Sequence, residues 1–89
     1  MSASYEKLAG EIIEKIGGKE NISNAYHCQT RLRFALKDEK KADTATVEAI
    51  DGVMKVIVNG GTFQVVIGPQ VADVFAEVDK QAGPFGKAG

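Results

Sequence analysis

The stretch Thr30-Arg-Leu-Arg-Phe-Ala-Leu-Lys37 decides the fold class, because its side chains alternate in character. The large apolar residues Leu32, Phe34 and Leu36 alternate with a second set of residues, which are Arg31, Arg33, Ala35 and Lys37. An alternation with a period of two is typical of a β-strand that buries one face and leaves the other more polar. The sequence therefore predicts a half-buried strand here.

Three further runs favour strands on either side of this one. Residues 22–27 form a short extended stretch, and residues 53–58 and 63–67 are rich in β-branched side chains. Asn59-Gly-Gly-Thr62 joins the last two runs and is predicted to be a four-residue hairpin loop. Two hairpins are therefore expected, one before and one after the middle of the chain.

Helical spacing of apolar residues predicts three helices between and around these hairpins. The first covers roughly Tyr5 to Ile16 with Ser4 as its cap, the second is short and begins at Asp43 or Thr44, and the third follows Gly68-Pro69. The order is helix, strand, strand, helix, strand, strand, helix. This pattern indicates an α+β fold, a four-stranded antiparallel sheet with three helices packed on one face.

Length and composition limit the classes of function. The chain has 89 residues, 44% hydrophobic and 26% charged, with a formal net charge of -1, which suits one globular domain and gives no indication of nucleic-acid binding. We expect residues 1–81 to form the domain and residues 82–89, with three of the ten glycines, to be a linker or disordered tail. No apolar run reaches the ~18 residues needed to span a bilayer, and no signal peptide is expected.

The rare residues gather in one place. The single Cys, the single His and both Arg lie between His27 and Arg33. One cysteine excludes an internal disulfide, and one Cys with one His cannot supply four zinc ligands, so no metal is expected. No nucleotide-binding glycine loop or Mg²⁺-binding carboxylate cluster is found either, so no cofactor is expected.

Cys28 is predicted to lie in the turn between the first two strands, with chemistry suited to an anion. Nearby positive charge lowers the pKa of a thiol from about 8.5 and favours the nucleophilic thiolate. Arg31 and Arg33 project to the same strand face, are expected to stand exposed beside the thiol, and carry guanidinium groups that match phosphate oxygens. The backbone N–H groups of Gln29, Thr30 and Arg31, and the Thr30 hydroxyl, add donors. This set suits a cysteine that carries a phosphoryl group.

Each of these residues could also have a structural role without any part in chemistry. A free cysteine is often buried and inert, and two arginines on a strand are often a solvated face. His27 could act as a general base. However, adjacent side chains on a strand point to opposite faces, so a surface or binding role is favoured for it.

The motif His27-Cys-Gln-Thr-Arg-Leu-Arg-Phe34, with Gly52-Val53 and Phe63-Gln-Val-Val-Ile-Gly68 downstream, resembles the IIB domain of the bacterial sugar phosphotransferase system. The similarity covers roughly residues 5–80 and is greatest to the β-glucoside and sucrose members of the glucose/sucrose/β-glucoside branch. One departure is Lys55, which stands where that family usually has a glycine.

The resemblance implies a fold and a function. The fold of the family is an antiparallel four-stranded sheet with helices on one face. Cys28 would accept a phosphoryl group from a phosphohistidine of a IIA domain and donate it to a sugar bound by the membrane domain IIC, with Thr30, Arg31 and Arg33 around the phosphocysteine. The domain would be a transferase component at the cytoplasmic face of the bacterial cell membrane, tethered to IIC, without inserting into the membrane itself. Both a free-standing chain and a part of a longer polypeptide are compatible with the sequence.

Two alternatives belong to other classes of function. A domain of this kind could be a regulatory module that binds an anion or a partner protein without transferring a phosphoryl group. A cysteine with a lowered pKa could also sense oxidants, although the chain has no second cysteine to form a disulfide with it.

Overall fold

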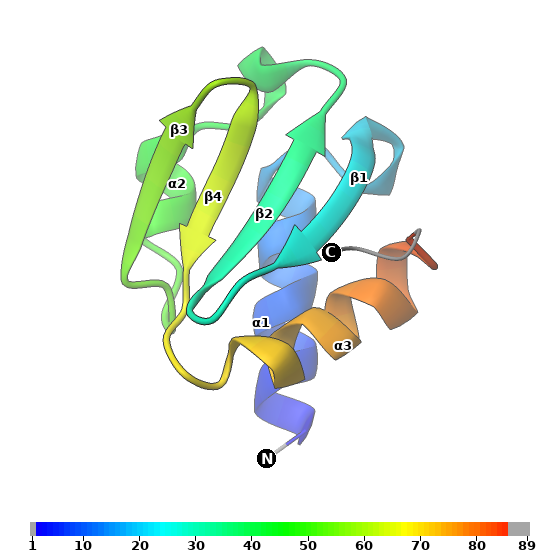
Figure 1. Ribbon diagram of the computed structural model, residues 1–89, viewed down its shortest axis with the longest axis vertical. Helices are drawn as coiled ribbons and strands as arrows, with labels where there is room; N and C mark the ends of the chain where they lie inside the picture. Colours follow the sequence, from blue (N-terminus) through cyan, green and yellow to red (C-terminus); the bar gives the residue numbers. More distant parts are fainter. Residues whose placement is uncertain (1, 86–89) are drawn as a thin grey trace.

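A computed structural model describes residues 2–85 of the chain and shows seven helices and strands in the predicted order (Figure 1). They are α1 (Ser2–Lys15), β1 (Ile22–His27), β2 (Arg31–Leu36), α2 (Thr44–Glu48), β3 (Lys55–Asn59), β4 (Thr62–Val66) and α3 (Val71–Ala82). Two short 3-10 turns, Lys19–Asn21 and Glu39–Lys41, lead into β1 and follow β2. The order of elements predicted from the sequence is confirmed.

The four strands form one sheet with the order β1-β2-β4-β3, and every neighbouring pair is antiparallel. The second strand of each hairpin is therefore central, and β2 pairs with β4 although 25 residues separate the end of one from the start of the other. Leu32 of β2 pairs with His27 on one side and with Val65 on the other. This register places residues from all four strands in rows across the sheet.

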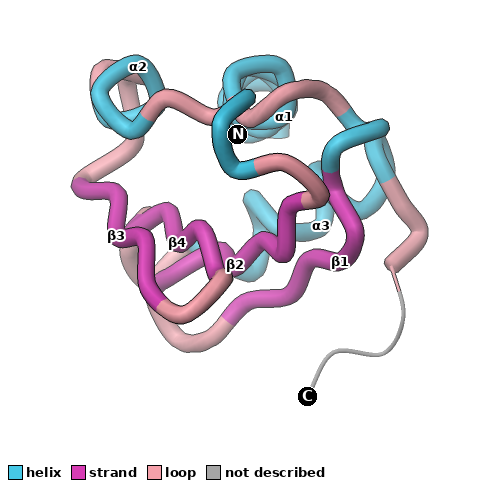
Figure 2. The backbone as a smooth tube through the Cα atoms, turned by 90° about the horizontal axis from the view of Figure 1, so that it is seen from above, coloured by secondary structure: helices cyan, strands magenta, loops and turns pink. Residues whose placement is uncertain are grey.

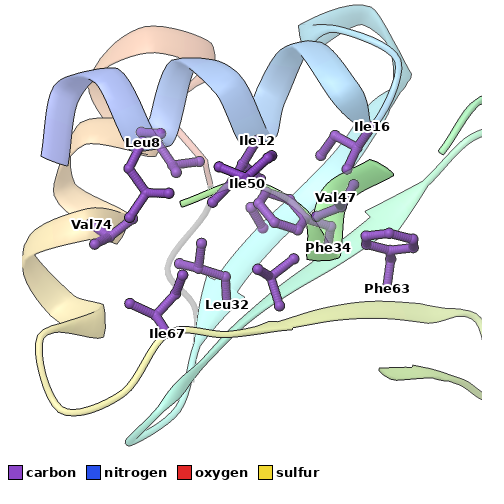
Figure 3. Close-up of a cluster of buried hydrophobic side chains, with 14 of the residues drawn as sticks. Leu8, Ile12, Ile16, Leu32, Phe34, Val47, Ile50, Phe63, Ile67 and Val74 are labelled. Carbon is purple, nitrogen blue, oxygen red and sulfur yellow. The ribbon is translucent and has the colours of Figure 1, made fainter. Parts of the chain in front are cut away.

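The helices lie on one side of the sheet, and the core fills the space between the two layers (Figure 2). Leu32 and Phe34, the apolar positions of the alternating strand, are fully buried. They meet Ile12 and Ile16 of α1 and Val74 of α3 in one cluster (Figure 3). Because strand side chains alternate, Arg31 and Arg33 lie on the opposite face, which no described helix covers.

The hairpin between β3 and β4 is tighter than predicted. Asn59 pairs with Thr62, so the loop contains only Gly60 and Gly61 instead of four residues. These glycines have φ angles of +59° and +82°. Two successive positive φ angles form a turn whose twist matches that of the flanking strands, and glycine adopts them at little steric cost.

Two smaller expectations also change. Helix α1 begins at Ser2, so Ser4 lies inside the helix and is not its cap. Lys55, which replaces a common glycine of the resembled family, begins β3 and pairs with Val66. No non-glycine residue among residues 2–85 has a positive φ, so this position does not need a glycine here.

Candidate functional site

The site begins with the turn that joins β1 to β2 at one end of the sheet. The backbone N–H of Cys28 donates to the carbonyl of Arg31 at 3.0 Å and closes this turn. The Thr30 carbonyl accepts from the N–H groups of Ile67 and Gly68, at 2.8 and 3.0 Å. The turn is thereby fixed to the segment that leads from β4 into α3, which lies beside it at the lower end of the sheet (Figure 1).

Cys28 is a free, half-buried thiol whose environment stabilises the thiolate. The backbone N–H of Thr30, the N–H of Arg31 and the side chain of Arg33 lower the pKa of the Cys28 thiol to about 7, against the opposing effect of burial. Hydrogen bonds to the charged form and a nearby cation both favour ionisation. A lowered pKa raises the share of thiolate at neutral pH, and the thiolate is the nucleophilic form of cysteine.

Arg33 is the arginine that meets the thiol. Its interaction with Cys28, and a smaller one with the phenol of Tyr26, raise the pKa of the Arg33 guanidinium. Tyr26 is its cross-strand neighbour on β1. The Nε–H of Arg33 is buried and has no hydrogen-bond partner among the described residues. Buried donors are nearly always paired, so this unpaired Nε–H is an exception within the site.

Arg31 occupies the same face of the sheet but turns to a different neighbour. Its Nη1 donates to the side-chain oxygen of Gln64 on β4 at 2.9 Å. The expectation that both guanidinium groups stand exposed beside the thiol is therefore wrong in two respects. Both residues are half-buried, and only Arg33 acts on the thiol through its side chain. The shared strand face was predictable from alternation, whereas the direction of each long side chain depends on cross-strand neighbours.

His27 lies on the helix side of the sheet, away from the arginines. Its cross-strand neighbour is the core residue Leu32, and its ring centroid is 5.0 Å from that of Phe75 on α3. The Nδ1 atom contacts the Cys28 carbonyl at 2.9 Å. A carbonyl can only accept, so Nδ1 carries the proton in this contact. His27 therefore supports the turn from behind.

Two residues of this site were not found from the sequence, Tyr26 and Gln64. Each of them is a single polar side chain within a strand, which alone does not indicate a site. The side chains that they face depend on the register between the strands, which the sequence does not give. Gln64 was the clearer of the two, because it interrupts the apolar run Phe63-Gln-Val-Val-Ile67.

The site is a turn at the end of the sheet, and Cys28 is half-buried in it. A hollow of ≈ 370 Å³ lies elsewhere, between α1 and the segment before β3, and it is lined by Tyr5, Lys7, Leu8, Glu11, Asp51, Gly52 and Gln70. Within residues 2–85 no group of three or more His, Cys, Asp or Glu side chains could hold a metal ion. Nor does the described part of the chain contain a helix long and apolar enough to cross a membrane.

The fold and the turn define a class, a small α+β domain that presents one activated cysteine at the end of its sheet. Residues 10–43 match the protein family described as "phosphotransferase system, EIIB". A crystal structure of one domain of the phosphotransferase system (PTS) IIabc component from Clostridium difficile superposes with a TM-score of 0.84 at 38% identity. The similarity covers 90% of this chain and 84% of that one. The chain belongs to the EIIB domain family of the phosphotransferase system.

Longer proteins contain related segments. A PTS β-glucoside-specific EIIBCA component from Halalkalibacterium halodurans is 51% identical over 79 residues, which are 89% of this chain. A PTS sucrose-specific EIIBC component from Bacillus subtilis is 44% identical over 79 residues, which are 88% of this chain. The chain spans only 12% and 17% of the lengths of these two curated relatives.

Proposed function

We propose that this domain carries a phosphoryl group on Cys28 within a sugar-transporting phosphotransferase system. The observation that carries the proposal is the Cys28 thiol, with its pKa lowered to about 7 by the N–H groups of Thr30 and Arg31 and by the Arg33 side chain. The donors that stabilise a thiolate are also suited to a phosphoryl group, which adds about -1.5 to -2 charges. Membership of the EIIB family supports the same role.

The proposed relay has two balanced steps. In the first step the Cys28 thiol loses its proton to solvent, and the thiolate attacks the phosphorus of a IIA phosphohistidine. An S–P bond forms, the P–N bond breaks, and the histidine nitrogen keeps the electron pair and takes a proton. In the second step a sugar hydroxyl bound by IIC attacks the same phosphorus. An O–P bond forms, the S–P bond breaks, the hydroxyl proton leaves to solvent and Cys28 is again a thiolate.

The residues of the turn have distinct parts in this proposal. The N–H groups of Thr30 and Arg31 and the Arg33 guanidinium hold charge on the sulfur and then on the equatorial phosphoryl oxygens. Phosphoryl transfer proceeds through a loose transition state, so positioning and charge stabilisation supply most of the catalysis. A half-buried surface turn also lets two large partners reach the same sulfur in succession.

The names of the relatives support two partner domains for this chain, IIC and IIA. Their names describe fused EIIBCA and EIIBC components, which supports IIC, and in some systems IIA, as parts of the same polypeptide. Residues 1–81 then form the EIIB domain at the cytoplasmic face of the membrane. Ala82 is the last residue of α3 and Phe85 packs against the core, so the linker expected from residue 82 onwards does not begin there. Of this segment, residues 86–89 lie outside the described part of the chain.

Intact mass spectrometry tests the proposal directly. Wild-type chain incubated with phosphorylated IIA should gain the mass of one phosphoryl group, about 80 Da, and Cys28→Ala should gain none. A matched control is His27→Ala, which should still be phosphorylated because the imidazole lies on the other face of the sheet. A wild-type chain that gains no mass, or a Cys28→Ala variant that gains as much, would refute the phosphocysteine and leave the regulatory or redox alternatives.

A further inference from the structure

Gln64 is a buried polar residue on the sheet face that the helices leave uncovered. Only 5% of its surface is exposed. It pairs across the strands with Arg33 on one side and with Ile57 on the other. Tyr26, Arg33, Gln64 and Ile57 therefore form one row across all four strands, and this row continues directly from the residues that surround the thiol. A buried polar side chain nearly always has a hydrogen-bond partner.

The hydrogen-bond partner of Gln64 is Arg31. The side-chain oxygen of Gln64 accepts from Nη1 of Arg31 at 2.9 Å. Arg31 is not its direct cross-strand partner but its diagonal neighbour, since Arg31 pairs with Val66 and Gln64 with Arg33. Diagonal neighbours lie within reach of long side chains. The two arginines are thereby separated: one reaches the thiol, and the other is held on β4.

We infer that Gln64 is a positioning residue for phosphoryl transfer, which holds the Arg31 guanidinium ready to receive the phosphoryl group when it arrives on Cys28. The inference rests on the proposed function and assigns Gln64 no contact with the reacting atoms. The Arg33 guanidinium stabilises the resting thiolate and then the phosphoryl oxygens, whereas the Arg31 guanidinium acts only once the phosphoryl group is present.

The chemistry of the groups supports this division. A guanidinium has five N–H donors, and the bond to Gln64 uses one of them, so the others stay available to phosphoryl oxygens. A neutral amide holds the guanidinium without cancelling its charge, which a carboxylate at the same position would do. An arginine that is already ordered also loses less conformational freedom when the anion binds.

The test compares Gln64→Leu with wild type in transfer from phosphorylated IIA, measured over a range of donor concentrations. We expect the maximal rate to fall by about ten-fold, the size expected for one hydrogen bond to a charged group, with the KM for the donor unchanged. The pH profile of thiol alkylation should not move, because the side chain of Arg33, and not that of Arg31, acts on the thiol. Gln81→Leu is the matched control, since the Gln81 side chain, on α3, donates to the Glu6 carbonyl of α1, and its rate should equal that of wild type.

A double-mutant cycle separates positioning from simple packing. If Gln64 acts through Arg31, adding Gln64→Leu to Arg31→Lys should cause no further loss, whereas adding it to Arg33→Lys should cause the full loss. Gln64→Met, which keeps the side-chain length, serves if Gln64→Leu is poorly folded by circular dichroism. The inference is overturned if folded Gln64 variants transfer at the wild-type rate, or if the loss is equal in both arginine backgrounds. If wild type itself accepts no phosphoryl group, the proposed function fails and this inference with it.

Discussion

The Cys28 thiol owes its lowered pKa more to the backbone than to its charged neighbours. The N–H of Thr30 makes the largest contribution to the lowered pKa, and the Arg31 N–H and the Arg33 side chain follow. The tight turn itself provides two of these donors, because it points successive N–H groups towards the sulfur. Side-chain substitutions at Thr30 should therefore leave the thiolate largely intact.

This leads to a prediction for the rate of alkylation of Cys28 by iodoacetamide as a function of pH. The rate should rise with pH and level off with a midpoint near pH 7, because only the thiolate reacts. Thr30→Ala should keep that midpoint, since the backbone N–H remains. Arg33→Met should move the midpoint to higher pH, since the cation that favours the thiolate is lost. A wild-type midpoint at about 8.5, the ordinary value for a cysteine, would contradict this account.

At the scale of elements, the β3–β4 turn depends on the backbone freedom of glycine. The φ angle of Gly61 is +82°, and a Cβ atom built there would meet no other atom within 4 Å. Any loss on substitution therefore arises from backbone strain alone. We predict that Gly61→Ala lowers the free energy of unfolding in urea by about 1 kcal/mol, the cost of left-handed backbone for a residue with a Cβ atom.

Gly10→Ala provides the control for this prediction. Gly10 lies inside α1, where alanine is the better helix former, and its new Cβ would meet only the flexible end of Gln81. This variant should be neutral or more stable than wild type. Equal losses at both positions would mean that the loss at Gly61 does not come from the turn.

The elements also show what a sequence can and cannot predict. The alternation around Leu32 and Phe34 predicted strand, buried face and fold class together, because a period of two is a local property. The pairing of β2 with β4 was not predictable in the same way, since it joins residues far apart in the chain. For this reason the contact between Arg31 and Gln64 was also missed. Its two residues meet only when that register is set.

In the whole molecule, the acidic residues lie outside the sheet. All twelve acidic residues lie on helices, turns and loops, and the strands carry none. The strands carry three basic residues on the uncovered sheet face, Arg31, Arg33 and Lys55. Arg31 and Lys55 both pair with Val66 and lie in one row across the sheet, and Arg33 lies two residues further along β2. The formal net charge of -1 therefore conceals a basic sheet face beside the thiol. An anion that approaches Cys28 along this face meets no carboxylate of the sheet.

The stability of the whole domain should depend on the ionisation of Cys28. The pKa of its thiol is about 7 in the folded domain and about 8.5 in the unfolded chain, so between these values the unfolded state binds more protons. The folded state should therefore gain stability as pH rises from 7 to about 8.5, and this gain should be lost as pH falls through 7. Urea unfolding of wild type and Cys28→Ser at several pH values measures it, because titration of all other groups cancels in the difference. We expect the difference in unfolding free energy to be flat below pH 7 and to change in favour of wild type up to about pH 8.5, whereas parallel curves would show that the fold does not stabilise the thiolate.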